Sequence, residues 1–224
     1  RHADRPRPWL VCIHGYGMGI PAVDLSAFEA RRLHFELGLN ILCPVLPLHG
    51  PRKLSLRSGD GFLNGDFLDT VHAEAQAMWD LRRLLSWLRA DGATQIGVYG
   101  LSLGGYTTAL LTGLDSGLAC AIAGIPATDF SRLVARLAPH ATLREIERLG
   151  LDWSFVRDVL SVVSPLRLVP KIAIERLSIF GGTADQYDTN AQGVIRKGGG
   201  LRLTWAKAAE RAIALGGVYD GTDV

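Results

Sequence analysis

The chain has 224 residues, enough for one sizeable core, since single α/β domains often run to about 200–250 residues. Its 48% hydrophobic and 21% charged content is typical of a globular protein, and a formal net charge of only +2 excludes a bulk electrostatic case for nucleic-acid binding. The longest apolar runs, such as Leu118–Pro126, are far shorter than the roughly 20 residues that a membrane span needs, so we expect no membrane span.

The first hundred residues alternate short apolar runs with helical periodicity. Trp9–His14, Asn40–Pro47 and Thr94–Gly100 are short runs of the kind expected in buried parallel strands. Between them, Leu25–Leu37 has apolar residues at helical spacing, and Thr70–Ala90 is the clearest helix. Six residues define the predicted apolar face of that helix, with Asp69 as its N-cap: Val71, Ala75, Met78, Leu81, Leu85 and Leu88.

The second half continues the alternation. A helix is predicted from Leu103, strands at Leu118–Pro126 and Arg176–Gly182, and a helical cap insertion over about 129–163. Strands that alternate with helices imply a mostly parallel sheet with helices on both faces, joined by right-handed crossovers. We find no internal repeat and treat residues 1–224 as a single domain with an atypical C-terminal tail over about 189–224.

The stretch from Val98 to Thr107, VYGLSLGGYT, places one serine between two glycines. Gly100, Ser102 and Gly104 form a G-x-S-x-G pattern between a predicted strand and a predicted helix, which is the context of a nucleophile on a sharp, strained turn. Glycines two residues before and two after the serine leave room where a side chain would clash. The alternative is an ordinary structural glycine corner.

In the order of these elements the chain resembles the α/β-hydrolase superfamily, in its serine esterase and lipase-like branch. The resemblance rests on strand WLVCIH, loop HGYG, strand NILCPVLP, the elbow YGLSLGG and strand RLSIFGG, and covers nearly all of Trp9–Asp185. It implies cleavage of an ester, thioester or amide through an acyl-enzyme on Ser102. A segment LPLHGPR follows the second strand, and the resemblance implies that it helps to form the pocket.

The resemblance also implies an oxyanion hole made by backbone N–H groups. Its donors are expected to be Tyr16 or Gly17 in the loop after the first strand, and Leu103 after the serine. The alternative is a mere glycine turn in which His14 is hydrogen-bonded for structural reasons. His14 and His49 remain possible pocket residues.

The acid of the triad is expected at Asp185, after the strand that follows the cap, with Asp188 and Asp129 as alternatives. No histidine follows Asp185, although the family order is serine, acid, histidine. The chain has six histidines: His2, His14, His34, His49, His72 and His140. Only His140 lies beyond the serine, in the cap, where a surface position is its simplest interpretation. The sequence therefore indicates a hydrolase altered or incomplete at both ends.

Cys12, Cys43 and Cys120 each lie inside a strand-like run. This pattern favours buried free thiols in a reducing compartment, hence a cytoplasmic protein, and not a disulfide framework or metal site. We find no signal-peptide pattern. No paired metal ligands occur at useful spacing, so neither metal nor cofactor is expected.

Two functions remain open. The first is a serine hydrolase that acts on a small-molecule ester, with an apolar or acyl substrate suggested by apolar cap residues: Leu133, Leu137, Leu143, Leu149, Trp153 and Phe155. The second is a catalytically inactive binding protein, or a truncated or frame-shifted copy, on the same scaffold. A dinucleotide-binding oxidoreductase is disfavoured, because GYGMG is not G-x-G-x-x-G and LPLHG offers no acidic residue for a ribose. The sequence does not indicate the oligomeric state.

Overall fold

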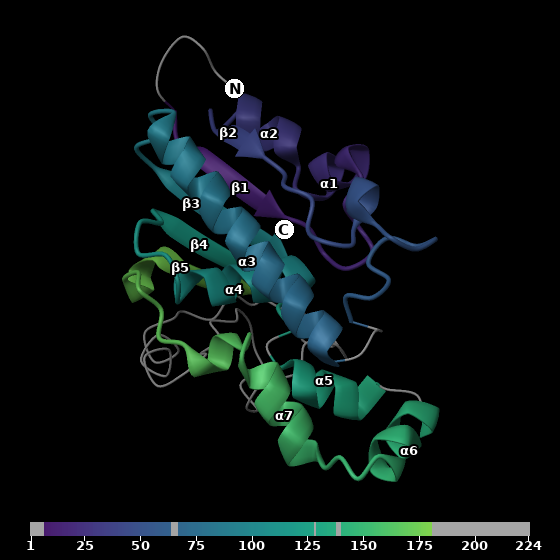
Figure 1. Ribbon diagram of the computed structural model, residues 1–224. Helices are drawn as coiled ribbons and strands as arrows, with labels where there is room; N and C mark the ends of the chain where they lie inside the picture. The colour runs from purple at the N-terminus through teal and green to yellow at the C-terminus, as the bar shows by residue number, and fades with distance from the viewer. Residues whose placement is uncertain (1–6, 64–66, 128, 138–139, 181–224) are drawn as a thin grey trace, which may run out of the picture.

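A computed structural model describes residues 7–63, 67–127, 129–137 and 140–180. Its centre is a five-stranded sheet in the order β2-β1-β3-β4-β5 (Figure 1). The strands are β1 (Trp9–Ile13), β2 (Asn40–Leu42), β3 (Ile96–Leu101), β4 (Cys120–Gly124) and β5 (Leu177–Phe180). Every neighbouring pair is parallel, which confirms the predicted sheet.

The second strand is the one that the sequence overestimates. Instead of Asn40–Pro47, β2 pairs with β1 only over Asn40–Leu42. Pro44 lacks a backbone N–H and cannot donate to a ladder, so the chain leaves the sheet before it. The other four strands lie within the predicted runs or within a residue of them.

Seven α-helices occur in the described residues. They are α1 (Pro21–Ala27), α2 (Ala30–Phe35), α3 (Phe67–Ala90), α4 (Leu103–Thr112), α5 (Phe130–Leu137), α6 (His140–Arg148) and α7 (Trp153–Ser161). Short 3₁₀ turns cover Gly50–Arg52, Pro165–Arg167 and Ile174–Arg176. The single helix expected over Leu25–Leu37 is two helices, because Glu29 takes a left-handed conformation (φ 47°) that breaks the helical run.

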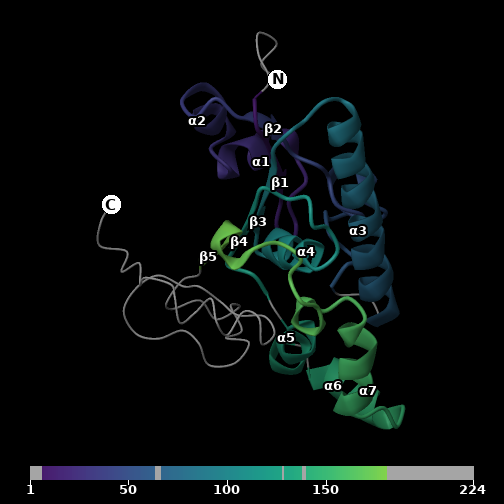
Figure 2. The ribbon, with the colours of Figure 1, turned by 90° about the vertical axis from the view of Figure 1, so that its left-hand side faces the viewer.

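Helices cover both faces of the sheet, as predicted (Figure 2). On one face, α3 and α4 bury the larger core, which takes Val11 and Ile13 from β1. On the other face, α1, α2 and the chain between them bury a small cluster around Leu10, Cys12 and Phe28. This alternation along β1 is what the two-residue period of a strand dictates. All three cysteines are free thiols, but only Cys12 is buried as expected, whereas Cys43 and Cys120 are partly buried.

The buried face of α3 differs from the predicted one. Ala75 is exposed, whereas Ala73, Glu74 and Ala77 are buried. Asp69 lies in the first turn of α3 and is not its N-cap, because the helix already includes Phe67. The predicted face was rotated by about one residue at its N-terminal end.

Three helices occupy the segment predicted as a cap (Figure 1). Tyr106 of α4 joins this segment to the sheet domain: its ring stacks on Phe130 with centroids 3.8 Å apart, and its hydroxyl donates to the Val163 carbonyl at 2.8 Å. None of the described helices is both long and apolar enough to cross a bilayer. Asp185, Asp188 and the predicted tail at 189–224 lie outside the described residues.

Candidate active site

Ser102 stands alone between the end of β3 and the start of α4. Its backbone has φ 54° and ψ −112°, a conformation that residues other than glycine rarely adopt and that costs about 1–3 kcal/mol. Its N–H donates to the Gly124 carbonyl at 2.8 Å, and its own carbonyl accepts from the Tyr106 N–H at 3.0 Å. The side chain is half-buried. The strain is therefore held by both a neighbouring strand and the first turn of the helix.

The glycines around Ser102 are fixed by backbone contacts. A Cβ at Gly104 would overlap the Ile13 carbonyl and lie 2.7 Å from the His14 oxygen. A Cβ at Gly100 would overlap the backbone of Gly104. Movement of a side chain cannot relieve these clashes, because the atoms met most closely at both positions are main-chain atoms. Only glycine allows β1, β3 and α4 to meet this closely.

The start of α4 presents backbone donors beside Ser102. The first N–H groups of a helix have no partner within the helix, and the helix dipole makes this end positive. Leu103 is the first residue of α4, and its side chain is buried. Negative charge that develops on an atom bonded to Ser102 would therefore lie near favourable dipoles.

The loop after β1 lies against Ser102 through Gly15. A Cβ built on Gly15 would be 3.5 Å from the Ser102 Cβ and 3.3 Å from the Leu101 carbonyl. The loop turns tightly here: the Met18 N–H donates to the Gly15 carbonyl at 3.3 Å, and the Gly15 N–H points at the Met18 sulfur, also at 3.3 Å. Gly17 has φ 77°, which favours glycine.

His14 holds this loop in place through hydrogen bonds to backbone groups. The Leu46 N–H donates to His14 Nε2 at 3.0 Å, so that nitrogen carries no proton, and Nδ1–H donates to the Gly15 carbonyl at 2.8 Å. The ring is fully buried, and burial lowers its pKa. Both ring nitrogens are therefore committed to backbone groups, and His14 ties the loop after β1 to the segment after β2.

His49 is also buried, beside His14, with ring centroids 5.0 Å apart. Its Nδ1 bonds the Pro47 carbonyl at 2.8 Å, while its Nε2 has no hydrogen-bond partner within the described residues. Gly59 covers that nitrogen, since a Cβ there would lie 2.8 Å from it. The half-exposed Tyr16 ring packs edge-on against His49 at 5.7 Å. Burial lowers the pKa of His49.

The other acid and base candidates lie in the segment predicted as a cap or outside the described residues. Asp129 caps the start of α5: its Oδ1 accepts from the Arg132 N–H at 3.1 Å and from the Ser131 hydroxyl at 2.6 Å. His140 begins α6. Asp185, expected as the triad acid, lies outside the described residues.

Glu74 is a residue of this region that the sequence interpretation missed. Its side chain is fully buried on α3, and its Oε2 lies 3.3 Å from the hydroxyl of Thr107 on α4. Burial raises its pKa to about 8. The signal was present in the sequence, because Glu74 precedes Met78 by four residues and Leu81 by seven, which puts it on the buried face of a helix.

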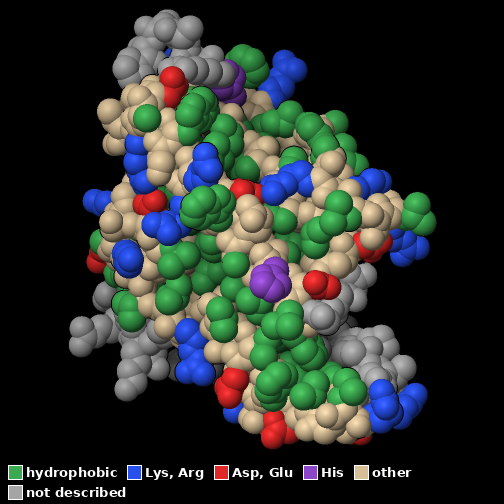
Figure 3. Space-filling view, viewed as in Figure 1, with side chains coloured by type: hydrophobic (Ala, Val, Ile, Leu, Met, Phe, Trp, Pro, Cys, Tyr) green, Lys and Arg blue, Asp and Glu red, His purple; other side chains and the backbone are tan. Residues whose placement is uncertain are grey.

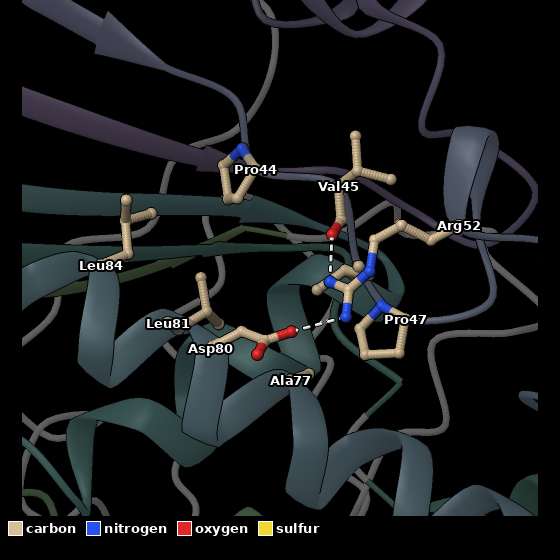
Figure 4. Close-up of a pocket in the computed structure, with 9 residues that line it drawn as sticks. Pro44, Val45, Pro47, Arg52, Ala77, Asp80, Leu81 and Leu84 are labelled. Atoms are coloured by element: carbon tan, nitrogen blue, oxygen red, sulfur yellow. Dashed lines mark hydrogen bonds and ion pairs between the residues drawn. The ribbon is translucent and has the colours of Figure 1, made fainter.

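A pocket of about 360 Å³ lies between the chain after β2 and α3 (Figure 4). Arg52 spans it, with Nη2 2.7 Å from the Asp80 carboxylate and Nη1 2.8 Å from the Val45 carbonyl. Its apolar walls are Pro44, Leu46, Pro47, Ala77, Leu81 and Leu84. Ser102 is not among the lining residues. The described residues contain no group of three or more side chains placed to hold a metal ion.

Comparison with known sequences finds no matching family model. The chain is 46% identical over 187 residues to two proteins of Mycobacterium tuberculosis, "Uncharacterized protein MT2702" and "Uncharacterized protein Rv2627c". The match covers 83% of this chain and 44% of each relative. The chain thus spans less than half the length of the curated relatives it matches.

Several solved structures share the arrangement of elements. An acetyl xylan esterase from Paenibacillus sp. R4 is 20% identical, with a TM-score of 0.55 over 81% of this chain and 59% of that one. Acetyl xylan esterase 1 from Thermoanaerobacterium sp. JW/SL YS485 is 16% identical, with a TM-score of 0.52 over 80% and 60%. Mouse alpha/beta hydrolase domain-containing protein 10 is 16% identical, with a TM-score of 0.50 over 80% and 70%. At these identities the likeness shows the fold.

Proposed function

Because the chain has the α/β-hydrolase fold, we propose that it is a serine hydrolase that cleaves a carboxylic ester through an acyl-enzyme on Ser102. The observation that carries this proposal is the strained backbone of Ser102, at φ 54° and ψ −112°, on the corner between β3 and α4. A corner that served only to turn the chain would be less strained with glycine at this position. A serine held there at a cost in free energy supports a functional role for its hydroxyl.

In the proposed reaction, a base takes the proton of the Ser102 hydroxyl as its Oγ bonds to the ester carbonyl carbon, and the carbonyl oxygen becomes an oxyanion. The N–H of Leu103, at the positive end of α4, and the N–H of Tyr16 or Gly17 donate to it. The contact between Gly15 and the Ser102 side chain supports this pairing, because it brings the loop after β1 to the serine. Collapse of the intermediate expels the alcohol, and water then hydrolyses the acyl-enzyme.

The proposed reaction needs a base, and neither buried histidine near the loop suits that role. His14 has both nitrogens bonded, and Gly59 covers the open nitrogen of His49. No histidine follows Asp185 in the sequence. We therefore propose that Ser102 of this chain is a positioned nucleophile whose attack becomes efficient when a base is supplied, with Asp185 as the residue that would orient a histidine.

The proposed substrate is a small ester with an apolar acyl or alkyl group. Large hydrophobic side chains are exposed on and around α6 and α7: Leu149, Trp153, Phe155 and Val162. Figure 3 shows hydrophobic side chains gathered at the lower end of the molecule, where these helices lie. Such an apolar surface supports a role in binding an apolar group.

Acylation by p-nitrophenyl acetate in the presence of added imidazole tests the proposal. Imidazole supplies the missing base, so we expect it to increase formation of an acetyl adduct on Ser102, detected by mass spectrometry of the digested protein. Ser102→Ala should abolish the adduct, whereas Ser86→Ala, which removes an exposed hydroxyl on α3, should not. Imidazole-dependent acetylation of the intact protein that continues at full yield in Ser102→Ala would place the acetyl group on another residue and remove the nucleophile assignment.

The second candidate is a binding protein without catalysis, favoured by the commitment of both ring nitrogens of His14 to backbone groups. A folded chain that forms no adduct on Ser102 at any imidazole concentration would support it. In that case p-nitrophenyl acetate hydrolysis should equal that of Ser102→Ala.

A further inference from the structure

The interface between α3 and α4 contains an acidic side chain that has no part in the proposed acylation. Glu74 has no exposed surface, and among the residues that the structure describes its Oε1 has no hydrogen-bond partner. Its Oε2 lies 3.3 Å from Thr107 Oγ1, its one polar contact there. Burying a carboxyl group with so little compensation is costly, so its presence calls for a physical account.

The hydroxyl of Thr107 determines how this contact must be made. Thr107 Oγ1 also lies 2.9 Å from the Leu103 carbonyl, which can only accept a hydrogen bond. The hydroxyl has one proton, and the shorter contact to Leu103 uses it. A favourable bond to Glu74 therefore requires the proton to come from the Glu74 carboxyl. The geometry describes a chain of two bonds, from a neutral Glu74 to Thr107 and from Thr107 to Leu103.

These two hydrogen bonds lead to the first turn of α4, beside Ser102. The Leu103 carbonyl belongs to the residue that directly follows Ser102, and its N–H is one of the proposed oxyanion donors. Thr107 lies one helical turn later. A bond network that fixes the Leu103 carbonyl also limits how far the peptide groups of this turn can tilt.

We propose that Glu74, as a neutral acid, is a positioning residue that holds the first turn of α4 through Thr107, and that its ionisation loosens that turn. This inference rests on the proposed function of Ser102 only for its effect on acylation. The structural part, a neutral acid that controls the Leu103 backbone, stands without it.

The surroundings of Glu74 favour the neutral form. From α4, Tyr106 interacts electrostatically with Glu74, and Asp129 interacts with Tyr106. The ionisable side chains of α7, Arg157 and Asp158, are exposed. On α3 itself, the neighbouring His72 is exposed. Within the described residues no cation contributes to the pKa of Glu74, which burial raises to about 8.

The first test follows the backbone directly. Amide resonances of Leu103 and Thr107 are recorded by NMR between pH 6 and pH 10 on the whole chain. We expect both resonances to shift with one midpoint near pH 8 in the unmodified protein and to show no shift in Glu74→Gln. The control variant is Glu147→Gln, which alters an exposed carboxyl on α6 and should keep the titration. Flat Leu103 and Thr107 amides in the unmodified protein would overturn the proposal.

Variants of Thr107 provide a second route that does not depend on Glu74→Gln folding. Thr107→Ser keeps the hydroxyl and should keep the coupling between Glu74 and the Leu103 amide. Thr107→Val keeps the shape and removes the hydroxyl, so the Leu103 amide should lose its titration even where Glu74 still ionises. Equal Leu103 titrations in the two variants would contradict a relay through Thr107.

Acylation then connects the network to the site. With imidazole added, acetyl transfer to Ser102 should fall severalfold between pH 8 and pH 10 in the unmodified protein relative to Glu74→Gln. If no adduct forms at any pH while the Leu103 amide still titrates, the proposed function fails and the positioning role of Glu74 survives. If the adduct forms with the same pH profile in both proteins, Glu74 does not position the site.

Discussion

Two segments meet at Ser102, and they are held in place by different means. The corner between β3 and α4 is fixed by main-chain packing, with Gly104 against the Ile13 carbonyl and the Ser102 N–H bonded to Gly124. The loop after β1 is fixed by side chains, above all by His14, which bonds Gly15 and Leu46. The corner therefore depends on the absence of side chains, and the loop on their presence.

The same contrast extends to protons. His14 and His49, beside the loop after β1, are buried rings whose pKa values burial lowers, so folding favours their neutral forms. Burial raises the pKa of Glu74, so folding favours its neutral form as well. Low pH should therefore destabilise the loop after β1, and high pH should destabilise the corner between β3 and α4.

Replacement of Gly104 by alanine should be the most damaging change. Its Cβ would overlap the Ile13 carbonyl, so β1 and α4 would have to separate, and we expect a loss of about 5 kcal/mol or more in the free energy of unfolding. Urea denaturation measures it. Gly92→Ala is the matched control: Gly92 has φ 90° but open space around it, so strain alone should cost about 1–2 kcal/mol. Equal losses would mean that packing does not fix the corner.

Glu74→Gln should stabilise the protein at alkaline pH. The folded pKa is about 8 and the unfolded value is 4.5, so the unfolded state binds fewer protons between these values and stability falls as pH rises through them. The amide does not ionise and escapes this loss, which at pH 9 amounts to a few kcal/mol. Thermal unfolding of both proteins at pH 4 and pH 9 checks the sign. A gain of the same size at both pH values would show that ionisation is not its cause.

His14→Ala should weaken the loop by about 2 kcal/mol, because the buried Leu46 N–H loses its acceptor. His72→Ala, at an exposed position on α3, should change stability by less than about 0.5 kcal/mol. The difference between the two variants by urea denaturation isolates the anchor. If His14→Ala were as mild as His72→Ala, side chains would not be what fixes the loop.

The acid response of the loop has a defined sign. The folded pKa of His14 and that of His49 lie below the unfolded value of 6.5, so the unfolded state binds more protons as pH falls through 6.5. Stability is therefore retained above pH 6.5 and lost below it. Amide hydrogen exchange at pH 7 and pH 5, corrected for intrinsic rates, should show lost protection at Leu46 before Tyr106. The reverse order would contradict the division between loop and corner.

Arg52 should have the smallest effect. It links the chain after β2 to α3 through Asp80, but both side chains are about a third or more exposed, so a double-mutant cycle with Arg52→Met and Asp80→Asn should give a coupling of less than about 1 kcal/mol. A coupling severalfold larger would make this ion pair a third anchor of the region.

The sequence predicted the sheet well because each strand is a short, continuous apolar run, and it predicted the Ser102 corner because G-x-S-x-G has one dominant steric explanation. It could not give the end of β2, where Pro44 competes with an apolar run, nor the break at Glu29. Glu74 was missed because an acidic residue is normally assigned to solvent, although its spacing from Met78 places it inside. The burial and hydrogen bonding of His14 and His49 depend on contacts between segments that are distant in the sequence. His14 and Leu46, for example, are 32 residues apart, and hydrophobic periodicity does not encode such a contact.

The brevity of β2 has a consequence of its own. Among the described residues this strand forms one edge of the sheet, and an edge with a long row of unsatisfied amide and carbonyl groups is a template on which other chains can pair. Here the row ends after Leu42, and proline two residues later provides no amide hydrogen. Lengthening this strand, for instance through Pro44→Val, would therefore be expected to make the protein more prone to self-association into sheets that grow from this side.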